Sequence, residues 1–262
     1  MAIYVLENTV QHYAWGSNDA LPALLGKENP SGEPWAELWM GAHPRAPSVA
    51  VDPSTGARKP LDALIAAAPG ATIGADVARR FGGELPFLFK LLSAARPLSV
   101  QAHPSKRKAE HGFAREESKG IPIDAAERNY KDPNHKPETV VALTSFEGLC
   151  GFRPIEAIVD ATRLLAPDDW ERLIGRLAVD PCKLELSSFI YMIMSIDGEH
   201  KARRLSYARS RSERIVADEP RGSGRSRLFS WVLRLMDEYP NDIGALAPLA
   251  LNLFELSPGE AI

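Results

Sequence analysis

The distribution of apolar and polar residues changes near Pro154, and it predicts a β-rich region followed by a helical one. Before Pro154, short stretches of alternating apolar and polar residues are separated by Gly and Pro, which is typical of β-strands and turns. We expect strands within residues 2–15, 46–52, 85–92, 97–103, 138–143 and 146–152. Short helices are predicted within residues 60–69, 74–82 and 104–118, the last with Ser105 as its N-cap.

After Pro154, apolar residues recur every three or four positions, which indicates amphipathic helices. The predicted helices lie within residues 155–166, 168–179, 187–196, 198–218 and 226–240. Asp168 or Asp169 supplies an acidic first turn for the second helix, and residues 217–227 read as a loop. We therefore expect a β region over residues 1–153, an inserted helical domain over 154–244 and a return to the β region over 245–262.

The end of the chain predicts a strand and then a turn. Residues 248–256 alternate as a strand, and the Ser-Pro-Gly sequence at 257–259 is a turn signal. Because a turn normally leads into another strand, the pattern favours a chain that is cut short after Ile262. A frayed terminal tail is an equally good interpretation of the pattern alone.

Composition narrows the classes of function. The 262 residues carry a formal net charge of -3, which gives no electrostatic basis for nucleic acid as the main partner. The arginine-rich segment 203–214 is better explained as a solvated helix face. Two cysteines, Cys150 and Cys182, are too few for a disulfide framework, and the N-terminal residues lack the features of a signal peptide. These observations predict a cytoplasmic protein with no membrane partner.

Two sets of polar residues at strand positions could hold a metal ion. In a strand, Ser99, Gln101 and His103 would share one face, and so would Lys136 and Glu138. Histidine and glutamate are ordinary zinc ligands, and a glutamine carbonyl is a rarer oxygen donor. The spacing by itself is common, so satisfied polar residues at a strand edge remain the main alternative to a metal site.

A charged residue also interrupts each of two apolar stretches. Lys90 lies in the apolar stretch 85–92, which favours a central strand and a lysine that faces a pocket, although an edge-strand lysine is the alternative. Glu37 lies between Trp35 and Trp39, where the aromatic residues can equally be part of the core. Both side chains are candidates for binding or proton transfer.

Six motifs in order identify a resemblance to a known family. They are YAWGS, AELWMGAHP, LPFLFKLL, LSVQAHP, ERNYKDPNHKPE and LSPGEA, and the chain resembles type I phosphomannose isomerases over its whole length. The resemblance implies a mainly β fold, a cupin-like jelly-roll β-sandwich with an inserted helical domain. It implies zinc-dependent interconversion of mannose 6-phosphate and fructose 6-phosphate through an enediol, by a protein expected to be a monomer.

The resemblance also assigns residues to the site. The zinc ligands carry over to Gln101, His103 and Glu138. Lys136 and Glu37 are the candidates in this chain for the catalytic base, and the choice between them stays open. The residues expected to contact substrate are Ser99, Lys90 and Trp15.

The chain departs from the family pattern at its end. In the family, the turn after LSPGEA leads to a His-Ala-Tyr motif whose histidine is the fourth zinc ligand, and no histidine of this chain matches it. We therefore expect a fragment that binds zinc weakly and turns over poorly. The alternative functions are a sugar-binding cupin without catalysis and an iron oxygenase, and Gln101 in place of a second histidine argues against the oxygenase.

Overall fold

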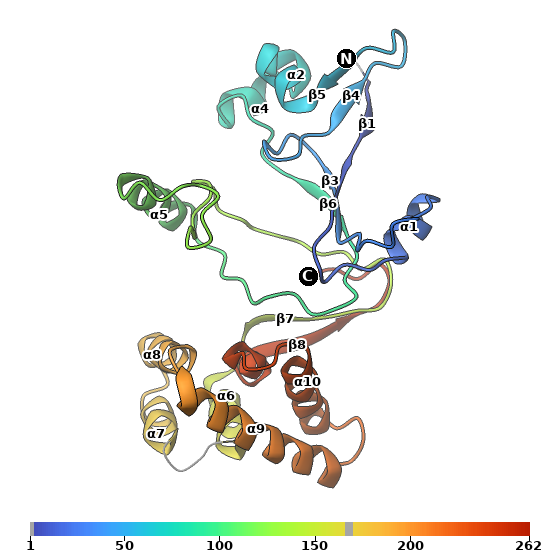
Figure 1. Cartoon of the computed structure of the whole chain (residues 1–262). Coiled ribbons are helices and arrows are strands. Elements are labelled where there is room, and N and C mark those ends of the chain that lie inside the picture. Colours follow the sequence, from blue (N-terminus) through green and yellow to red (C-terminus); the bar gives the residue numbers. More distant parts are fainter. Residues whose placement is uncertain (1–2, 166–169) are drawn as a thin grey trace. The chain divides into compact units, whose positions relative to one another are not determined.

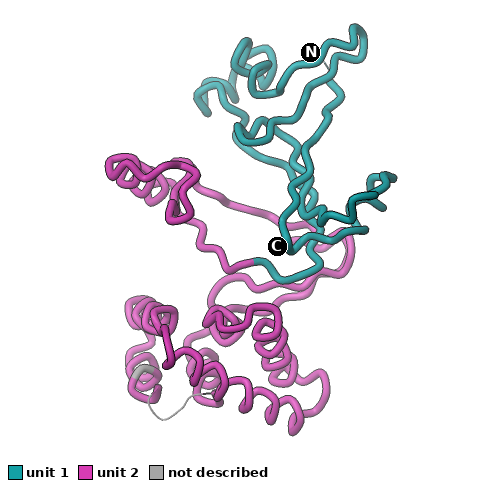
Figure 2. Tube along the Cα trace, in the orientation of Figure 1, with its two compact units in different colours: residues 1–98 teal, residues 99–262 magenta. Residues whose placement is uncertain are grey.

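The computed structural model describes residues 3–165 and 170–262, which cluster into two compact units, 1–98 and 99–262 (Figures 1 and 2). The unit boundary falls just before Ser99. The three-part division at Pro154 and Gly244 stays a prediction. The helix start expected at Asp168 or Asp169 lies outside the described residues.

The first unit is built from two small antiparallel sheets and short helices. One sheet has the strand order β1 (Val5–Glu7), β4 (Val49–Val51), β5 (Arg58–Pro60), and the other has the order β2 (Thr9–Gln11), β3 (Glu37–Met40), β6 (Phe89–Leu92). The helices are α1 (Ala20–Leu25), α2 (Leu61–Ala67), α3 (Pro69–Thr72) and α4 (Ala75–Arg80). This unit carries Trp15, Glu37 and Lys90 among its residues.

The register of the β2–β3–β6 sheet places polar residues together on one face. Two cross-strand rows lie on this face, Thr9–Trp39–Lys90 and Gln11–Glu37–Leu92. Directly paired residues in antiparallel strands share a face, so Glu37 and Lys90 are diagonal neighbours. Within the described residues β6 pairs with β3 alone. The central strand predicted around Lys90 is therefore wrong, because β6 forms an edge of its sheet.

The second unit contains helices where the sequence predicted them. They are α5 (Lys106–Ser118), α6 (Ile155–Leu165), α7 (Glu171–Val179), α8 (Lys183–Met194), α9 (Gly198–Asp218) and α10 (Gly224–Glu238). The 3-10 helix η2 (Ile243–Leu249), which was not predicted, follows them and includes the first residues of the strand expected over 248–256. Ser105 caps α5 as predicted, since its side chain accepts a hydrogen bond from the Lys108 backbone N–H. Across the described ranges, no helix combines the length and apolarity needed to cross a membrane.

The helices from α6 to η2 share one hydrophobic core. Its fully buried side chains include Ile158, Ile174, Phe229 and Val232. Figure 1 shows these helices gathered beside the two-stranded sheet of β7 (Phe146–Phe152) and β8 (Leu251–Leu256). The loop expected over residues 217–227 is shorter than predicted, because Ser223 caps α10 by accepting a hydrogen bond from Ser226.

An arginine of the helical part joins it to this sheet. Glu147 of β7 and Glu255 of β8 lie directly opposite each other, where like charges repel. The Arg227 guanidinium of α10 contacts both carboxylates, at 2.7 Å and 3.0 Å. The hydrogen bond to Glu147 is the main reason that the pKa of Arg227 is raised. Arg227 therefore offsets the repulsion and ties α10 to both strands.

Two predicted strands do not form. Residues 97–103 carry no strand, and residues 138–143 contribute only an isolated bridge between Val141 and Ala261. A strand needs a hydrogen-bonded neighbour, and within the described ranges no element is paired with 97–103. The shared strand face expected for Ser99, Gln101 and His103 is therefore wrong. Around the bridge, Val140 and Ala142 exchange backbone hydrogen bonds with residues 259–262.

Candidate functional site

In the first unit, the candidate residues Glu37 and Lys90 form a contact that includes Trp39. The Trp39 indole N–H donates to Glu37 Oε2 at 2.6 Å, and Lys90 Nζ lies 3.5 Å from Glu37 Oε1. The ammonium of Lys90 also lies 5.3 Å from the Trp39 ring centroid, within the range of a cation–π interaction. Both oxygens of the Glu37 carboxylate therefore have a partner, and the carboxylate is held in one orientation.

The two charged side chains of this contact differ in how far they are buried. The Glu37 side chain is 9% exposed, whereas that of Lys90 is 33% exposed. A buried carboxylate is costly unless charged or polar groups compensate it, and Lys90 and Trp39 do so here. The result is a fixed proton acceptor beside a cation that solvent can reach. The sequence predicted both residues but gave no indication that Trp39 orients the carboxylate.

Two further aromatic contacts lie in the same unit. The His43 ring packs edge-on against Trp39 at 4.7 Å between centroids, and Tyr13 stacks on Trp15 at 5.7 Å. Burial raises the pKa of the Tyr13 hydroxyl, and the negative charge of Glu37 adds to the increase. The backbone carbonyl of Trp15 accepts hydrogen bonds from the N–H groups of residues 95 and 96. These hydrogen bonds join the backbone of Trp15 to the segment that follows β6.

In the second unit, the structure brings His103 and Glu138 together. His103 Nε2 lies 3.8 Å from Glu138 Oε2, and the side chains are 34% and 55% exposed. Neither residue belongs to a strand, so the pairing arises from the path of the chain through α5 and back. Two donors that each lie ~2.0–2.2 Å from a zinc ion in tetrahedral geometry are about 3.4 Å apart, so a shift of a few tenths of an ångström would bring both side chains to one ion.

Beyond His103 and Glu138, the structure does not bring a third side chain of the usual metal-binding types to this place within the described residues. The described residues contain no group of three His, Cys, Asp or Glu side chains that could hold a metal ion. A third donor from this chain would thus be of another type, and the predicted one is the amide oxygen of Gln101, which is exposed. The structure shows no hydrogen bond from Gln101 to His103 or Glu138 within the residues it describes. An imidazole and a carboxylate are nevertheless the donor types that zinc prefers.

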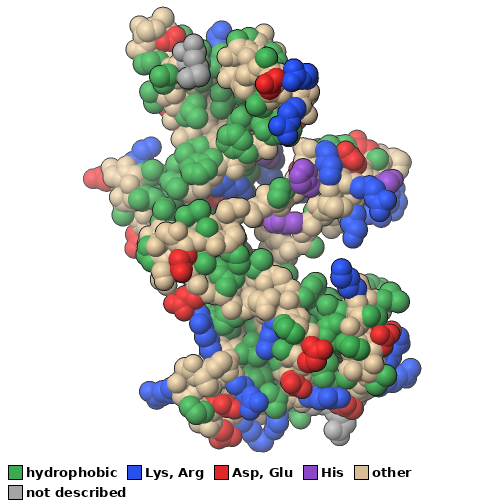
Figure 3. Space-filling model, turned by 180° about the vertical axis from the view of Figure 1, so that it is seen from behind, with side chains coloured by type: hydrophobic (Ala, Val, Ile, Leu, Met, Phe, Trp, Pro, Cys, Tyr) green, Lys and Arg blue, Asp and Glu red, His purple; other side chains and the backbone are tan. Residues whose placement is uncertain are grey.

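Ser99 and Lys136, the other candidates of this unit, lie on its surface. Lys136 Nζ is 3.4 Å from Asp132 Oδ2, four residues earlier. Ser99 is exposed in the segment between β6 and α5. Figure 3 shows histidine side chains close to Lys and Arg side chains on the part of the surface formed by the α5 region.

A buried ion pair that the sequence pattern did not indicate supports this region. We call residues 121–138, which follow α5, the strap. Glu116 of α5 and Arg128 of the strap are both buried, with Arg128 Nε 3.3 Å from Glu116 Oε2. The Glu116 carboxylate also accepts hydrogen bonds from the backbone N–H groups of Asn129 and Tyr130, at 3.1 Å and 2.8 Å. The bond from Tyr130 is the main reason that the pKa of Glu116 is lowered.

A glycine lets the strap approach α5 closely. A Cβ atom added to Gly112 would lie 2.5 Å from the ring of Tyr130, a distance that real Cβ atoms essentially never show. Gly175, inside α7, has no atom within 4 Å of the same position. The sequence pattern gave no sign of this difference, because both glycines simply interrupt a helical stretch.

These two glycines give a matched prediction. Gly112→Ala is expected to destabilise the chain by about 1–3 kcal/mol through overpacking, which outweighs the ~1 kcal/mol of helix propensity gained. Gly175→Ala has the same propensity gain without the clash and should stabilise the chain. Urea unfolding followed by circular dichroism measures both. Equal effects of the two substitutions would contradict the close packing of Tyr130 on Gly112.

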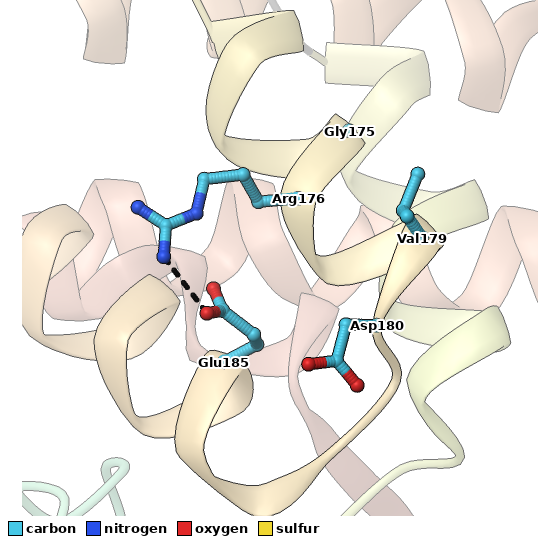
Figure 4. Close-up of a pocket in the computed structure, with 5 residues that line it drawn as sticks. All are labelled: Gly175, Arg176, Val179, Asp180 and Glu185. Carbon is cyan, nitrogen blue, oxygen red and sulfur yellow. Dashed lines mark hydrogen bonds and ion pairs between the residues drawn. The ribbon is translucent and has the colours of Figure 1, made fainter.

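A separate hollow lies in the helical part and is not the candidate site. Figure 4 shows it between α7 and α8, lined by Gly175, Arg176, Val179, Asp180 and Glu185, with a cavity volume of about 340 Å³. Its charged pair, Arg176 and Glu185, is already joined at 2.8 Å. None of the residues predicted to bind zinc or substrate lines it. The chemistry therefore favours the Glu37 and His103 regions over the hollow.

Comparison with known proteins relates these residues to one family. Residues 3–155 match the family model for phosphomannose isomerase type I, catalytic domain. The chain is 45% identical over 259 residues to mannose-6-phosphate isomerase of Escherichia coli (strain K12) and 36% identical over 285 residues to that of Homo sapiens. A crystal structure of mannose 6-phosphate isomerase from Salmonella typhimurium, bound to its substrate fructose 6-phosphate and to zinc, is similar with a TM-score of 0.85 at 42% identity.

The similarity covers this chain almost completely but not its relatives. The match to the Escherichia coli protein covers 98% of this chain but only 62% of the length of that protein. The match to the Salmonella typhimurium structure covers all of this chain and 63% of the length of that structure's chain. The chain thus spans somewhat less than two thirds of the relatives it matches.

Proposed function

The chain belongs to the type I phosphomannose isomerase family, and from this membership we propose that its protein interconverts mannose 6-phosphate and fructose 6-phosphate with a bound zinc ion. The observation that carries the proposal is the contact of His103 with Glu138 at 3.8 Å. These two side chains lie far apart in the sequence and belong to two separate motifs of the resemblance. Their meeting near the start of α5 gives a zinc ion two donors of the preferred types.

The proposed zinc ligands are His103, Glu138 and Gln101. His103 supplies a ring nitrogen, and Glu138 and Gln101 supply oxygens. A bound zinc ion acts as a Lewis acid that stabilises negative charge on a sugar oxygen. Because the proposed site has three donors, we expect this chain to hold zinc less tightly than a site with four donors, and to turn over slowly.

We propose that residues of the first unit transfer the substrate proton and compensate the negative charge that develops on the substrate. Interconversion of an aldose and a ketose moves a proton between two neighbouring carbons, which requires a base at that edge of the sugar. Glu37 is the better oriented of the two candidate bases, because Trp39 and Lys90 fix its carboxylate. Lys136 remains the other candidate. Which of the two takes the proton is decided by comparing Glu37→Gln with Lys136→Met.

Substrate binding is assigned to Lys90, Ser99 and Trp15. A lysine and a hydroxyl can donate hydrogen bonds to phosphate or to sugar oxygens. Trp15, stacked on Tyr13, offers a flat apolar surface for a sugar ring. We further propose that the sheets belong to a cupin-like jelly-roll, with the residues 154–244 as its helical insert between the β regions 1–153 and 245–262.

Isomerase turnover tests the proposed function. Purified, zinc-supplemented chain is incubated with mannose 6-phosphate, and fructose 6-phosphate is measured over time, with the Escherichia coli relative as the positive control. We expect conversion that is slower than that of the relative and is abolished by a chelator. Conversion that persists in the chelator would contradict the zinc proposal, and conversion at the relative's rate would contradict the three-donor reasoning.

Lys90 gives the prediction for substrate binding. Lys90→Met should weaken fructose 6-phosphate binding by about 10–100-fold, because a hydrogen bond to a charged group contributes ~1.5–3 kcal/mol. Lys59→Met is the matched control, since Lys59 is an exposed strand lysine of the same unit. Isothermal calorimetry of both variants measures the change. Equal affinities for the two variants would remove Lys90 from the binding site.

A further inference from the structure

Contacts between α5 and the strap extend from the C-terminal end of α5 to its start, where the His103–Glu138 pair lies. At the far end of α5, Glu116 accepts a hydrogen bond from the Tyr130 backbone N–H, 14 residues later. At its near end, Lys106 contacts Asn134, 28 residues later. Figure 1 shows the chain after α5 folding back beside the helix. The strap therefore runs back along α5 and reaches Glu138 where α5 begins, next to His103.

The far end of this arrangement is rigidly anchored. The Arg128 side chain is fully buried, and its donors reach the carbonyls of Tyr130 and Ile121, at 2.7 Å and 2.5 Å. A further donor reaches Glu117 at 2.6 Å. A buried arginine with its donors satisfied is fixed in place, because any movement leaves charge and donors uncompensated. This anchor sets where the strap starts, but it lies at the opposite end of α5 from His103.

Lys106 is the contact that fixes the near end. Its ammonium lies 3.0 Å from both the Pro133 carbonyl and Asn134 Oδ1, and 3.4 Å from Glu110 Oε1. An ammonium has three N–H donors, so each of these acceptors can take one. Lys106 comes three residues after His103 in the sequence, and Asn134 comes four residues before Glu138. Lys106 thus joins the two segments that carry the proposed ligand pair.

We propose that Lys106 is a positioning residue, which keeps Glu138 beside His103 by holding the strap against the start of α5. The inference rests on the proposed function, since it assumes that these two side chains bind zinc. Without the link, the residues from Pro133 to Glu138 gain freedom, and binding a metal must then order them. Groups that only hold a ligand in place typically change metal affinity by about 10–100-fold.

The test compares Lys106→Met with Lys108→Met in the 262-residue chain. Lys108 lies in the same turn of α5, is exposed, and has no side-chain hydrogen bond or ion pair within the described residues. Zinc affinity is measured by competition with a chelator, and the thermal midpoint of the metal-free chain is measured in parallel. We expect Lys106→Met to weaken zinc binding at least about tenfold with an unchanged midpoint, whereas Lys108→Met changes neither. Lys106→Arg, which keeps donors for both acceptors, should restore most of the affinity.

Three outcomes overturn the proposal, and they are distinguishable. If His103→Ala weakens zinc binding but Lys106→Met does not, the positioning role is wrong and the proposed metal site stands. If Lys106→Met lowers the midpoint and Lys106→Arg restores the midpoint without the zinc affinity, Lys106 is only a structural contact. If neither His103→Ala nor Lys106→Met changes zinc binding, the metal site itself is wrong, and with it the positioning role.

Discussion

Replacing His103 by alanine is expected to weaken zinc binding of the chain by more than about 100-fold, because the substitution removes a ligand and not merely a group that orients one. The same variant should lose the chelator-sensitive conversion of mannose 6-phosphate. His103 is partly exposed and packs in no core, so the variant should remain folded. Zinc affinity by chelator competition, with the thermal midpoint as a check on folding, measures the effect.

His111→Ala is the matched control for this prediction. His111 is an exposed histidine of α5, close to His103 in the sequence. The variant should bind zinc as the unchanged chain does. If the two alanine variants lose affinity to the same extent, zinc is held by the histidines of the α5 region in general, and the pairing of His103 with Glu138 has no special role.

The second large effect concerns stability, and it lies in the helical part of the second unit. Phe229→Ala is expected to cost about 3–5 kcal/mol of unfolding free energy, as is typical when a fully buried phenylalanine is truncated. Phe229 of α10 is 0% exposed and belongs to the core shared by α6 to η2. Urea unfolding followed by far-ultraviolet circular dichroism measures the loss.

Tyr191→Ala is the control for the core prediction. Tyr191 of α8 is a large aromatic residue that is mostly exposed, so its truncation should change the unfolding free energy by less than about 0.5 kcal/mol. A cost of several kcal/mol at Tyr191 would show that α8 buries this face against something else. Comparable small costs at both positions would contradict the helical core.

The sequence pattern predicted the helices better than the strands, for a physical reason. The apolar repeat of α9 or α10 extends over many turns, and each helix satisfies its own backbone hydrogen bonds. A strand needs a partner that the local sequence does not reveal. The alternation in residues 97–103 is as regular as that of the confirmed β7, yet only β7 has a neighbouring strand, β8, to pair with. The edge position of β6 was missed for the same reason.

The sequence predicted the candidate site residues but not the side chains that support them. The family motifs identified Glu37, Lys90, His103 and Glu138, and the structure places them as two contacting pairs. The side chains that hold these pairs were not predicted, because their contacts join distant parts of the chain. Trp39, which orients Glu37, is an example. The buried pair of Glu116 and Arg128 at the other end of α5 was missed as well, since an acidic residue in a helix and an arginine in a loop usually indicate solvent-exposed positions.

The most direct test of the proposed zinc site is a zinc titration followed by nuclear magnetic resonance of the histidine side chains. The chain has six histidines, whose imidazole nitrogens can be followed separately. We predict that one equivalent of zinc shifts the Nε2 resonance of His103 strongly and leaves those of His12, His43 and His200 in place. Zinc that shifts other histidines while His103 stays unchanged would contradict the proposed site.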